Sequence, residues 1–210
     1  MFTQVFAHIK KNQSVIRIRG SAVPESMHDF MTMNDFSKDI LAIMSIQHSE
    51  VESLTLDDLP ENLLIVRYNK SLLHLVAEMM FESYLEASWA HQYPDYFESL
   101  NACEKAIAEW GQENHTSILS IDDNIIGSCH ISTEGIQRHI GNVAIRPGYR
   151  KRGFGRFLVT SVLLDAVNES PEIESVRLAT THRSPAFHLY ESLGFITDSI
   201  QYQFAWSKKE

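Results

Sequence analysis

Hydrophobic and polar positions follow two different periods in the first part of the chain. Apolar and polar residues alternate over residues 2–10 and again over 14–20, and this period of two predicts a hairpin of two short strands. From Met27 to Ile46 apolar residues recur at steps of three and four. Because that spacing places them on one side of a helix, it predicts a helix over this stretch.

The run Val51 to Leu56 predicts a strand, and an acidic stretch with a proline follows it at 57–61. We therefore expect residues 1–60 to form a small ββαβ unit with a structural or oligomerising role. Its order of hairpin, helix and strand loosely resembles the opening of crotonase-superfamily proteins. The resemblance covers only this unit and includes no motif specific to that superfamily.

Residues 61–210 are expected to form a second, larger domain of mixed α/β (α+β) class. Helical spacing alternates there with short apolar runs that turn residues separate. Ser71 is the predicted N-cap of the first helix. The predicted elements are a strand at 63–68, helices at 72–89 and 97–110, strands at 116–121, 125–133 and 139–147, a helix at 155–167, a strand at 175–180, a helix at 185–193, and strands at 195–198 and 200–207.

Composition restricts the classes of function. The chain has 210 residues and a net charge of −9, which disfavours nucleic acid and anionic membranes as partners. Cys103 and Cys129 are isolated, and the histidines form no metal-binding motif, so we expect neither a disulfide framework nor a metal site. No run of eighteen apolar residues and no charged leader occurs, which favours a cytoplasmic protein.

Basic residues are concentrated in the stretch RPGYRKRGFGR, Arg146 to Arg156, between a predicted strand and a predicted helix. The first N–H groups of a helix have no partner within it and attract anions. Gly153 and Gly155 would allow a phosphate to approach the backbone. The stretch lacks the GxxxxGK pattern of a Walker loop and the third glycine of a dinucleotide fingerprint. Taken alone, it fits either a diphosphate site or a solvated turn.

Two motifs decide between these interpretations. Arg150-x-x-Gly153-x-Gly155 follows the strand NVAIRP, and AFHLYESLGF, Ala186 to Phe195, comes some thirty residues later. They are similar to the Q/R-x-x-G-x-G/A loop and the A-x-x-L-Y-x-x-x-G-F motif of the GNAT superfamily of N-acyltransferases, in the same order. The resemblance covers about residues 62–210 and implies a mixed, mostly antiparallel sheet flanked by helices.

The resemblance implies acetyl-CoA as cosubstrate. In that family the strand before the loop binds the pantetheine arm through its backbone, and the loop binds the diphosphate through backbone N–H groups. One departure is Arg183, which stands where the family often has an asparagine that binds pantetheine. The positions that would contact the cofactor are Val143, Ala144, Ile145, Arg150, Lys151, Arg152, Gly153, Phe154, Gly155, Arg156 and Arg183.

The resemblance also assigns catalytic roles. Tyr190 stands at the family's position for the group that donates a proton to the leaving thiolate. Alternation along the preceding strand places His139 on one face with Gly141, Val143 and Ile145, where it is a candidate general base. Glu134 is a competing base, and other members of the family use a carboxylate or a chain of waters.

We therefore expect an acetyl-CoA-dependent N-acetyltransferase that transfers an acetyl group to a primary amine of a small molecule or protein. An aromatic loop between the first two helices of the larger domain, with acidic residues beside it, would suit a cationic or aromatic amine. Its residues are Trp89, His91, Tyr93, Tyr96 and Phe97, near Glu82, Glu86 and Asp95. A non-catalytic CoA-binding or interaction module with the same fold is the alternative. The sequence leaves open whether the chain forms a homodimer.

Overall fold

A single mixed sheet of eight strands organises the protein. The computed structural model describes residues 11, 17–56, 60–85, 87, 98–110, 116–134 and 136–207. The strand order is β1-β8-β2-β7-β6-β5-β4-β3, and all neighbours are antiparallel except β6 and β7, so the predicted mostly antiparallel sheet is confirmed. The strands are β1 Arg17–Gly20, β2 Ser37–Gln47, β3 Leu63–Arg67, β4 Thr116–Ile121, β5 Asn124–Glu134, β6 Gln137–Ile145, β7 Ser175–Thr181 and β8 Ile196–Ser207.

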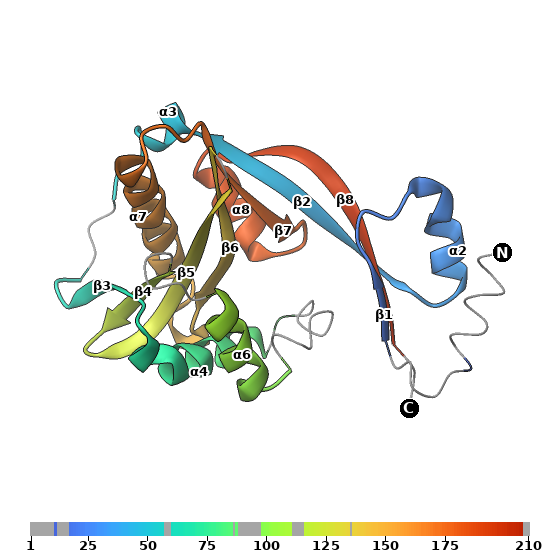
Figure 1. Ribbon diagram of the computed structural model, residues 1–210, viewed down its shortest axis with the longest axis horizontal. Helices are drawn as coiled ribbons and strands as arrows, with labels where there is room; N and C mark the ends of the chain where they lie inside the picture. The colour runs from blue at the N-terminus through green and yellow to red at the C-terminus, as the bar shows by residue number, and fades with distance from the viewer. Residues whose placement is uncertain are drawn as a thin grey trace.

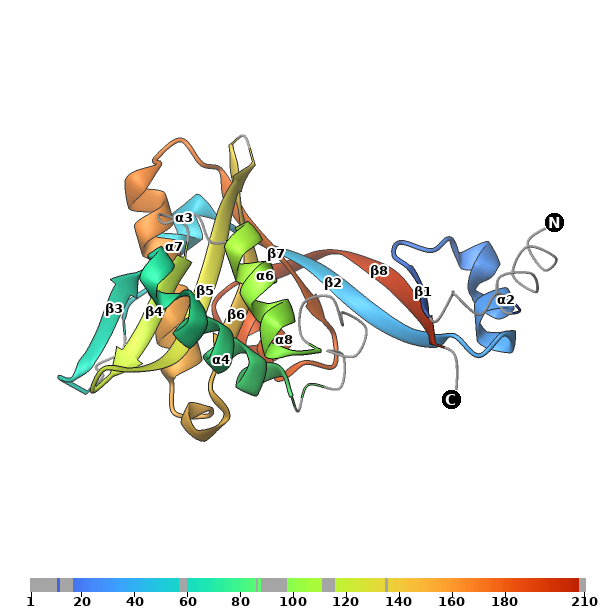
Figure 2. The same ribbon diagram turned by 60° about the horizontal axis from the view of Figure 1, so that its bottom comes forward.

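Helices cover both faces of the sheet, as Figures 1 and 2 show. Helices α7 and α8 bury their apolar sides in one large core with strands β2, β4, β5, β6 and β7. Helices α4 and α6 form a second core on the opposite face. The helices are α2 His28–Met33, α3 His48–Val51, α4 Leu73–Tyr84, α6 Leu100–Trp110, α7 Phe154–Glu169 and α8 Pro185–Ser192, with short 3-10 turns η1 Glu25–Met27, η2 Lys70–Leu72 and η4 Pro147–Tyr149.

The elements predicted for the larger domain are mostly confirmed. In α7, for example, Leu158, Val162 and Ala166 recur at steps of four and are all buried. Two details differ. The side chain that caps the first turn of η2 is Asn69, which accepts a hydrogen bond from the Ser71 N–H, so Ser71 is not the cap. The C-terminal residues form one continuous strand, β8, in place of the two strands predicted.

The prediction of a helix from Met27 to Ile46 is wrong for most of that stretch. Helix α2 ends at Met33, Asp35 adopts a left-handed backbone with φ of 64°, and β2 begins at Ser37. A left-handed residue stops a helix because it cannot continue the right-handed turn. Strand β2 carries apolar residues on both faces, and this double alternation also places apolar residues three and four apart. The sequence pattern was therefore ambiguous between helix and strand.

Strand β2 also corrects the expected ββαβ unit. It lies between β7 and β8 and pairs with both, so residues 37–47 are part of the main sheet. The stretch 51–56 is not a strand: α3 ends at Val51, and no strand is found in the rest of it. The loose crotonase resemblance thus loses its basis. The predicted strand at 2–10 and residues 57–59 of the predicted boundary lie outside the described residues.

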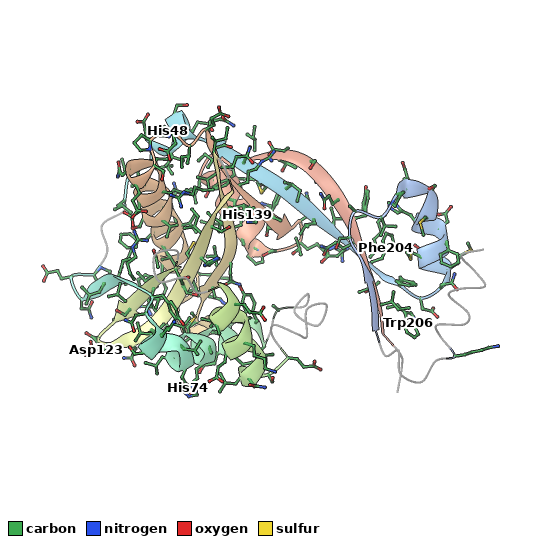
Figure 3. The ribbon with its side chains drawn as sticks, in the orientation of Figure 1. His48, His74, Asp123, His139, Phe204 and Trp206 are labelled. Atoms are coloured by element: carbon green, nitrogen blue, oxygen red, sulfur yellow. The ribbon has the colours of Figure 1, made fainter. Side chains whose placement is uncertain are left out.

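Strands β2 and β8 together extend beyond the body of the protein as a long two-stranded ribbon (Figures 1 and 2). Its far end carries β1 and α2, which surround a small third core. Phe204 and Trp206 of β8 are buried there, as Figure 3 shows at the end of the ribbon. The ribbon therefore joins a distal lobe to the body.

Candidate functional site

Strands β6 and β7 separate partway along their length. They pair in parallel from Gln137↔Ser175 to Ile140↔Leu178, and the described strands form no pair on this edge of β6 beyond that point. Strand β6 continues to Ile145, paired with β5 on its other edge. The backbone of Val143, Ala144 and Ile145 therefore lies along an edge that an extended ligand can join as a strand would.

A bulge in β6 changes which side chains share a face. Opposite β5, His130 pairs with Asn142 and Ile131 with Ile140, so Gly141 is the extra residue. Ile140 and Val143 consequently pack in the same core, on the side of α7. His139 lies on the opposite face with Asn142, so the predicted shared face of His139 and Val143 is wrong. Apart from the glycine itself, no sequence pattern indicated this bulge.

The turn after β6 presents a run of backbone donors. Lys151 and Gly153 both have left-handed backbones, with φ of 58° and 85°, and α7 begins at Phe154. Within the described residues, the backbone N–H groups from Lys151 to Gly155 have no acceptor, and the first bond of the helix runs from Phe157 N–H to Gly153 O. Consecutive N–H groups in this arrangement form a concave anion site at the positive end of a helix.

The basic side chains of the turn have different positions. The Arg150 guanidinium donates to the carbonyls of Ile145 and Ser83, and Arg156 donates to the carbonyl and hydroxyl of Ser192. Lys151 and Arg152 are exposed, and Arg152 stacks over the rings of two nearby aromatic residues. Arg150 and Arg156 thus connect the turn to neighbouring elements. The charged groups of Lys151 and Arg152 lie in solvent near the anion site.

Helix α4 holds the edge of β6 in place through three consecutive residues. Glu82 Oε2 lies 3.0 Å from Arg146 Nε, Ser83 O accepts from Arg150, and the Tyr84 hydroxyl donates to Val143 O at 3.0 Å. The Tyr84 oxygen also accepts from Asn142 Nδ2 at 2.9 Å. Sequence reasoning missed the role of Tyr84, because a helical apolar spacing carries no information about the strand that the helix contacts.

Tyr190 approaches the same place from the other side of the sheet. It lies on α8, is 5% exposed, and packs with its ring centroid 5.6 Å from that of Phe195. Burial raises the pKa of Tyr190, and Cys129 and Tyr84 raise it further, so these groups are close to its hydroxyl. Within the described part of the chain, that hydroxyl makes no hydrogen bond. It is therefore available as a donor to a bound molecule.

The other predicted site residues lie around this centre. Arg183 is exposed, just before Ser184, whose side chain caps α8 by accepting from the Ala186 N–H at 3.1 Å. His139 lies where β6 and β7 still run together (Figure 3). The side chain of Glu134, residue Glu86 and the predicted aromatic loop at 88–97 lie outside the described residues.

The comparisons with known proteins agree with this geometry. A model of the acetyltransferase (GNAT) family matches residues 75–195, more than half of the chain. The chain belongs to the GNAT acetyltransferase family. The family is one of acetyltransferases. A comparison with curated proteins finds no match.

Solved structures share the fold at low sequence identity. A GCN5-related N-acetyltransferase from Sphaerobacter thermophilus is 14% identical with a TM-score of 0.65, over 98% of this chain and 65% of that one. A protein of unknown function from Staphylococcus epidermidis is 12% identical with a TM-score of 0.72, over 99% of this chain and 78% of that one. The chain thus spans about two thirds of the length of the Sphaerobacter protein.

A third neighbour contains the cofactor. The PaiA N-acetyltransferase from Thermoplasma acidophilum, solved in complex with coenzyme A, is 15% identical with a TM-score of 0.53, over 70% of this chain and 99% of that one.

Among the described residues of the present protein, no helix is long and apolar enough to cross a membrane. The same residues contain no cluster of His, Cys, Asp or Glu suited to a metal ion.

Proposed function

We propose that the protein is an acetyl-CoA-dependent N-acetyltransferase acting on a primary amine of a small molecule or protein. The observation that carries the proposal is the run of backbone donors from Lys151 to Gly155 directly beyond the unpaired edge of β6. An anion site and an open strand edge, in sequence, fit a ligand made of a diphosphate and an extended amide arm.

The residues present fit coenzyme A along its length. The N–H groups of the turn, Lys151 to Arg156, would hold the diphosphate, and Lys151 and Arg152 add positive charge to an acidic protein. The backbone of Val143, Ala144 and Ile145 would bind the pantetheine arm chiefly through N–H groups, because the carbonyls of Val143 and Ile145 already accept from Tyr84 and Arg150. Arg150 and Arg156 support the turn through their bonds to protein carbonyls. Arg183, two residues before α8, would meet a polar group of the same ligand.

When bound, acetyl-CoA supplies an acyl group activated as a thioester. Tyr190 donates a hydrogen bond to the sulfur as negative charge develops there, and its raised pKa means that the hydroxyl keeps its proton into the alkaline range. His139 takes up the proton that the acceptor ammonium must lose, since an amine of pKa about 10.4 has no free lone pair when charged. Tyr84 fixes the carbonyl of Val143 and so the course of the strand.

Release of CoA thiol from acetyl-CoA, measured over a broad panel of amines, tests the proposal. We expect release with at least one amine, and a loss on the order of tenfold or more in kcat for Tyr190→Phe. Calorimetry should show that Tyr190→Phe still binds CoA.

Stabilisation by the cofactor separates this proposal from a non-catalytic CoA-binding module. At a concentration of about 100 Kd, acetyl-CoA should stabilise the fold by about 2.7 kcal/mol. Stabilisation without thiol release by any amine would favour the non-catalytic module. Absence of both thiol release and stabilisation would exclude a CoA site.

A further inference from the structure

A row of polar side chains crosses the sheet on the face that carries His139. His139 of β6 is in register with Arg177 of β7, and Arg177 is in register with Ser45 of β2. The row ends at Asp198, a residue of β8 that the pairing with β2 skips. Residues in register on adjacent strands point to the same face, so His139, Arg177 and Ser45 are neighbours there. Asp198 joins them through a hydrogen bond from the Ser45 hydroxyl. The opposite face of the same strands is packed against α7 and α8.

The row lies directly beside the place where β6 and β7 separate. The last pair of these strands, Ile140↔Leu178, is one residue beyond Arg177. Further along, the same face of β7 and β2 carries Ala179 and Ile43, which have no charge. Since a strand rises about 3.3 Å per residue, the backbone of Arg177 is only a few ångströms from the start of the unpaired edge.

Arg177 and Asp198 contact each other in the row, but Arg177 makes few hydrogen bonds there. Asp198 Oδ1 accepts from the hydroxyl of the buried Ser45 at 2.9 Å, and its other oxygen is 3.6 Å from Arg177 Nη2. The second terminal nitrogen of Arg177 donates to Gln137 Oε1 at 3.3 Å. Among the described residues the guanidinium has no closer partner, and 43% of the Arg177 side chain is exposed.

A guanidinium with five N–H donors and one moderate hydrogen bond can bind a further carboxylate through two parallel bonds. The protein as a whole has a charge of −9, so a carboxylate would be drawn to this face only by a local positive group. Asp198, at 3.6 Å, is beyond hydrogen-bond distance and competes with a ligand mainly by its charge.

We propose that Arg177 binds the carboxylate of the acceptor, and that the acceptor is a small molecule with a carboxylate a few bonds from its reacting amine, as in a free amino acid. The short separation follows from the position of Arg177 beside the point where β6 and β7 part. The proposal rests on the N-acetyltransferase function proposed above and adds the substrate class. Asp198 weakens the binding of the carboxylate, because it is a like charge held in place by Ser45.

The test compares the standard L-amino acids with their α-carboxamides, which keep the amine and lose the negative charge. Thiol release from acetyl-CoA gives KM and kcat, and calorimetry on the CoA-loaded protein gives Kd without turnover. We expect amino acids to bind and react better than their amides. Arg177→Gln should raise KM and Kd for an amino acid about 10- to 100-fold and leave those for its amide unchanged.

Two further variants sharpen the test. Asp198→Asn should lower KM for an amino acid several-fold, since it removes the competing charge and keeps a similar shape. Lys70→Gln removes an equal charge from an exposed position on η2 and should change neither constant. CoA affinity, measured for each variant, shows whether its fold is intact.

The outcomes separate this inference from the proposed function. The carboxylate site would be overturned if amides, or other amines with an uncharged tail, reacted at least as well as amino acids. The proposed acetyltransferase function would still stand in that case. An equal loss for acid and amide in Arg177→Gln would also overturn it, because only a structural role acts on both. Thiol release with no amine of any kind would instead reject the proposed function.

Discussion

Burial keeps three acidic groups neutral where β5, α4 and α8 meet. Cys129, Tyr84 and Tyr190 all have a raised pKa with burial as the largest cause. They come from both sides of the sheet, and Tyr84 and Cys129 add to the shift of Tyr190. The Tyr84 hydroxyl already donates to Val143 O, so the Tyr190 hydroxyl is the donor of this group that a ligand can use.

Stability should fall as pH rises above about 9 because of Cys129. Its pKa is raised from 9.0 to about 12 in the folded protein. Between these values the unfolded chain has lost the thiol proton and the folded chain has kept it, so rising pH favours unfolding, by about 1.4 kcal/mol per pH unit for one group. Denaturant unfolding at a series of pH values measures the slope. Cys129→Ala should reduce the slope by that amount, and an unchanged slope would contradict the assignment.

Gly153→Ala tests the backbone of the anion site. Gly153 has a φ of 85°, and a Cβ there would meet nothing within 4 Å, so the cost is conformational and amounts to about 1–2 kcal/mol. We expect a lower Tm and roughly tenfold weaker CoA binding by calorimetry, because the N–H groups no longer converge. Gly148→Ala is the matched control, since a Cβ there also meets nothing and no left-handed backbone is involved. Equal CoA affinity in both variants would argue against the turn as the diphosphate site.

At the scale of elements, α4 determines the position of the open edge of β6. Three consecutive residues of its last turn contact β6 or the turn that follows it. Strand β6 needs this support because no described strand pairs with it on one side beyond Ile140. We call these three contacts the brace. The brace makes the edge rigid before any ligand joins it, which lowers the entropic cost of binding.

Tyr84→Phe removes one contact of this brace. The substitution deletes the bond to Val143 O and leaves the Asn142 amide without that acceptor. We expect a loss of about 1–2 kcal/mol in the free energy of unfolding and a several-fold higher KM for acetyl-CoA. Tyr202→Phe in the distal lobe is the control, because its ring contacts with His28 and Lys38 remain. A KM that stays unchanged in Tyr84→Phe would mean that the strand holds its course without the brace.

The sequence pattern correctly predicted the elements that depend mainly on residues close together in the chain. Helix α7 and the turn before it follow from apolar steps of four and from two glycines, and the two motifs indicated the family. Strand β2 was missed because its partners, β7 and β8, lie more than a hundred residues further along the chain. Tyr84, Arg177 and Asp198 were missed for a similar reason: each acts beside residues of other elements, and no spacing in the sequence records that proximity.

The whole molecule depends on β2, because this N-terminal strand lies inside the main sheet. Two separate domains would not depend on each other in this way. Ala42, Met44 and Ile46 are fully buried in the core that contains Tyr190, and β2 supplies the only described partner of β7 on one side. Without β2, both β7 and β8 would expose unpaired edges and the core would lose three side chains. Strand β2 is therefore a structural part of the body of the protein.

Two truncations test this dependence. A chain of residues 61–210 should fail to fold, because it loses β2 and opens the core; circular dichroism and thermal unfolding would show no cooperative transition. A chain of residues 37–210 keeps β2 and loses only β1, α2 and their part of the distal core, so it should unfold cooperatively and bind CoA with nearly unchanged affinity. If residues 61–210 alone folded and bound CoA, the N-terminal unit would be a separate domain after all, and the insertion of β2 would be dispensable.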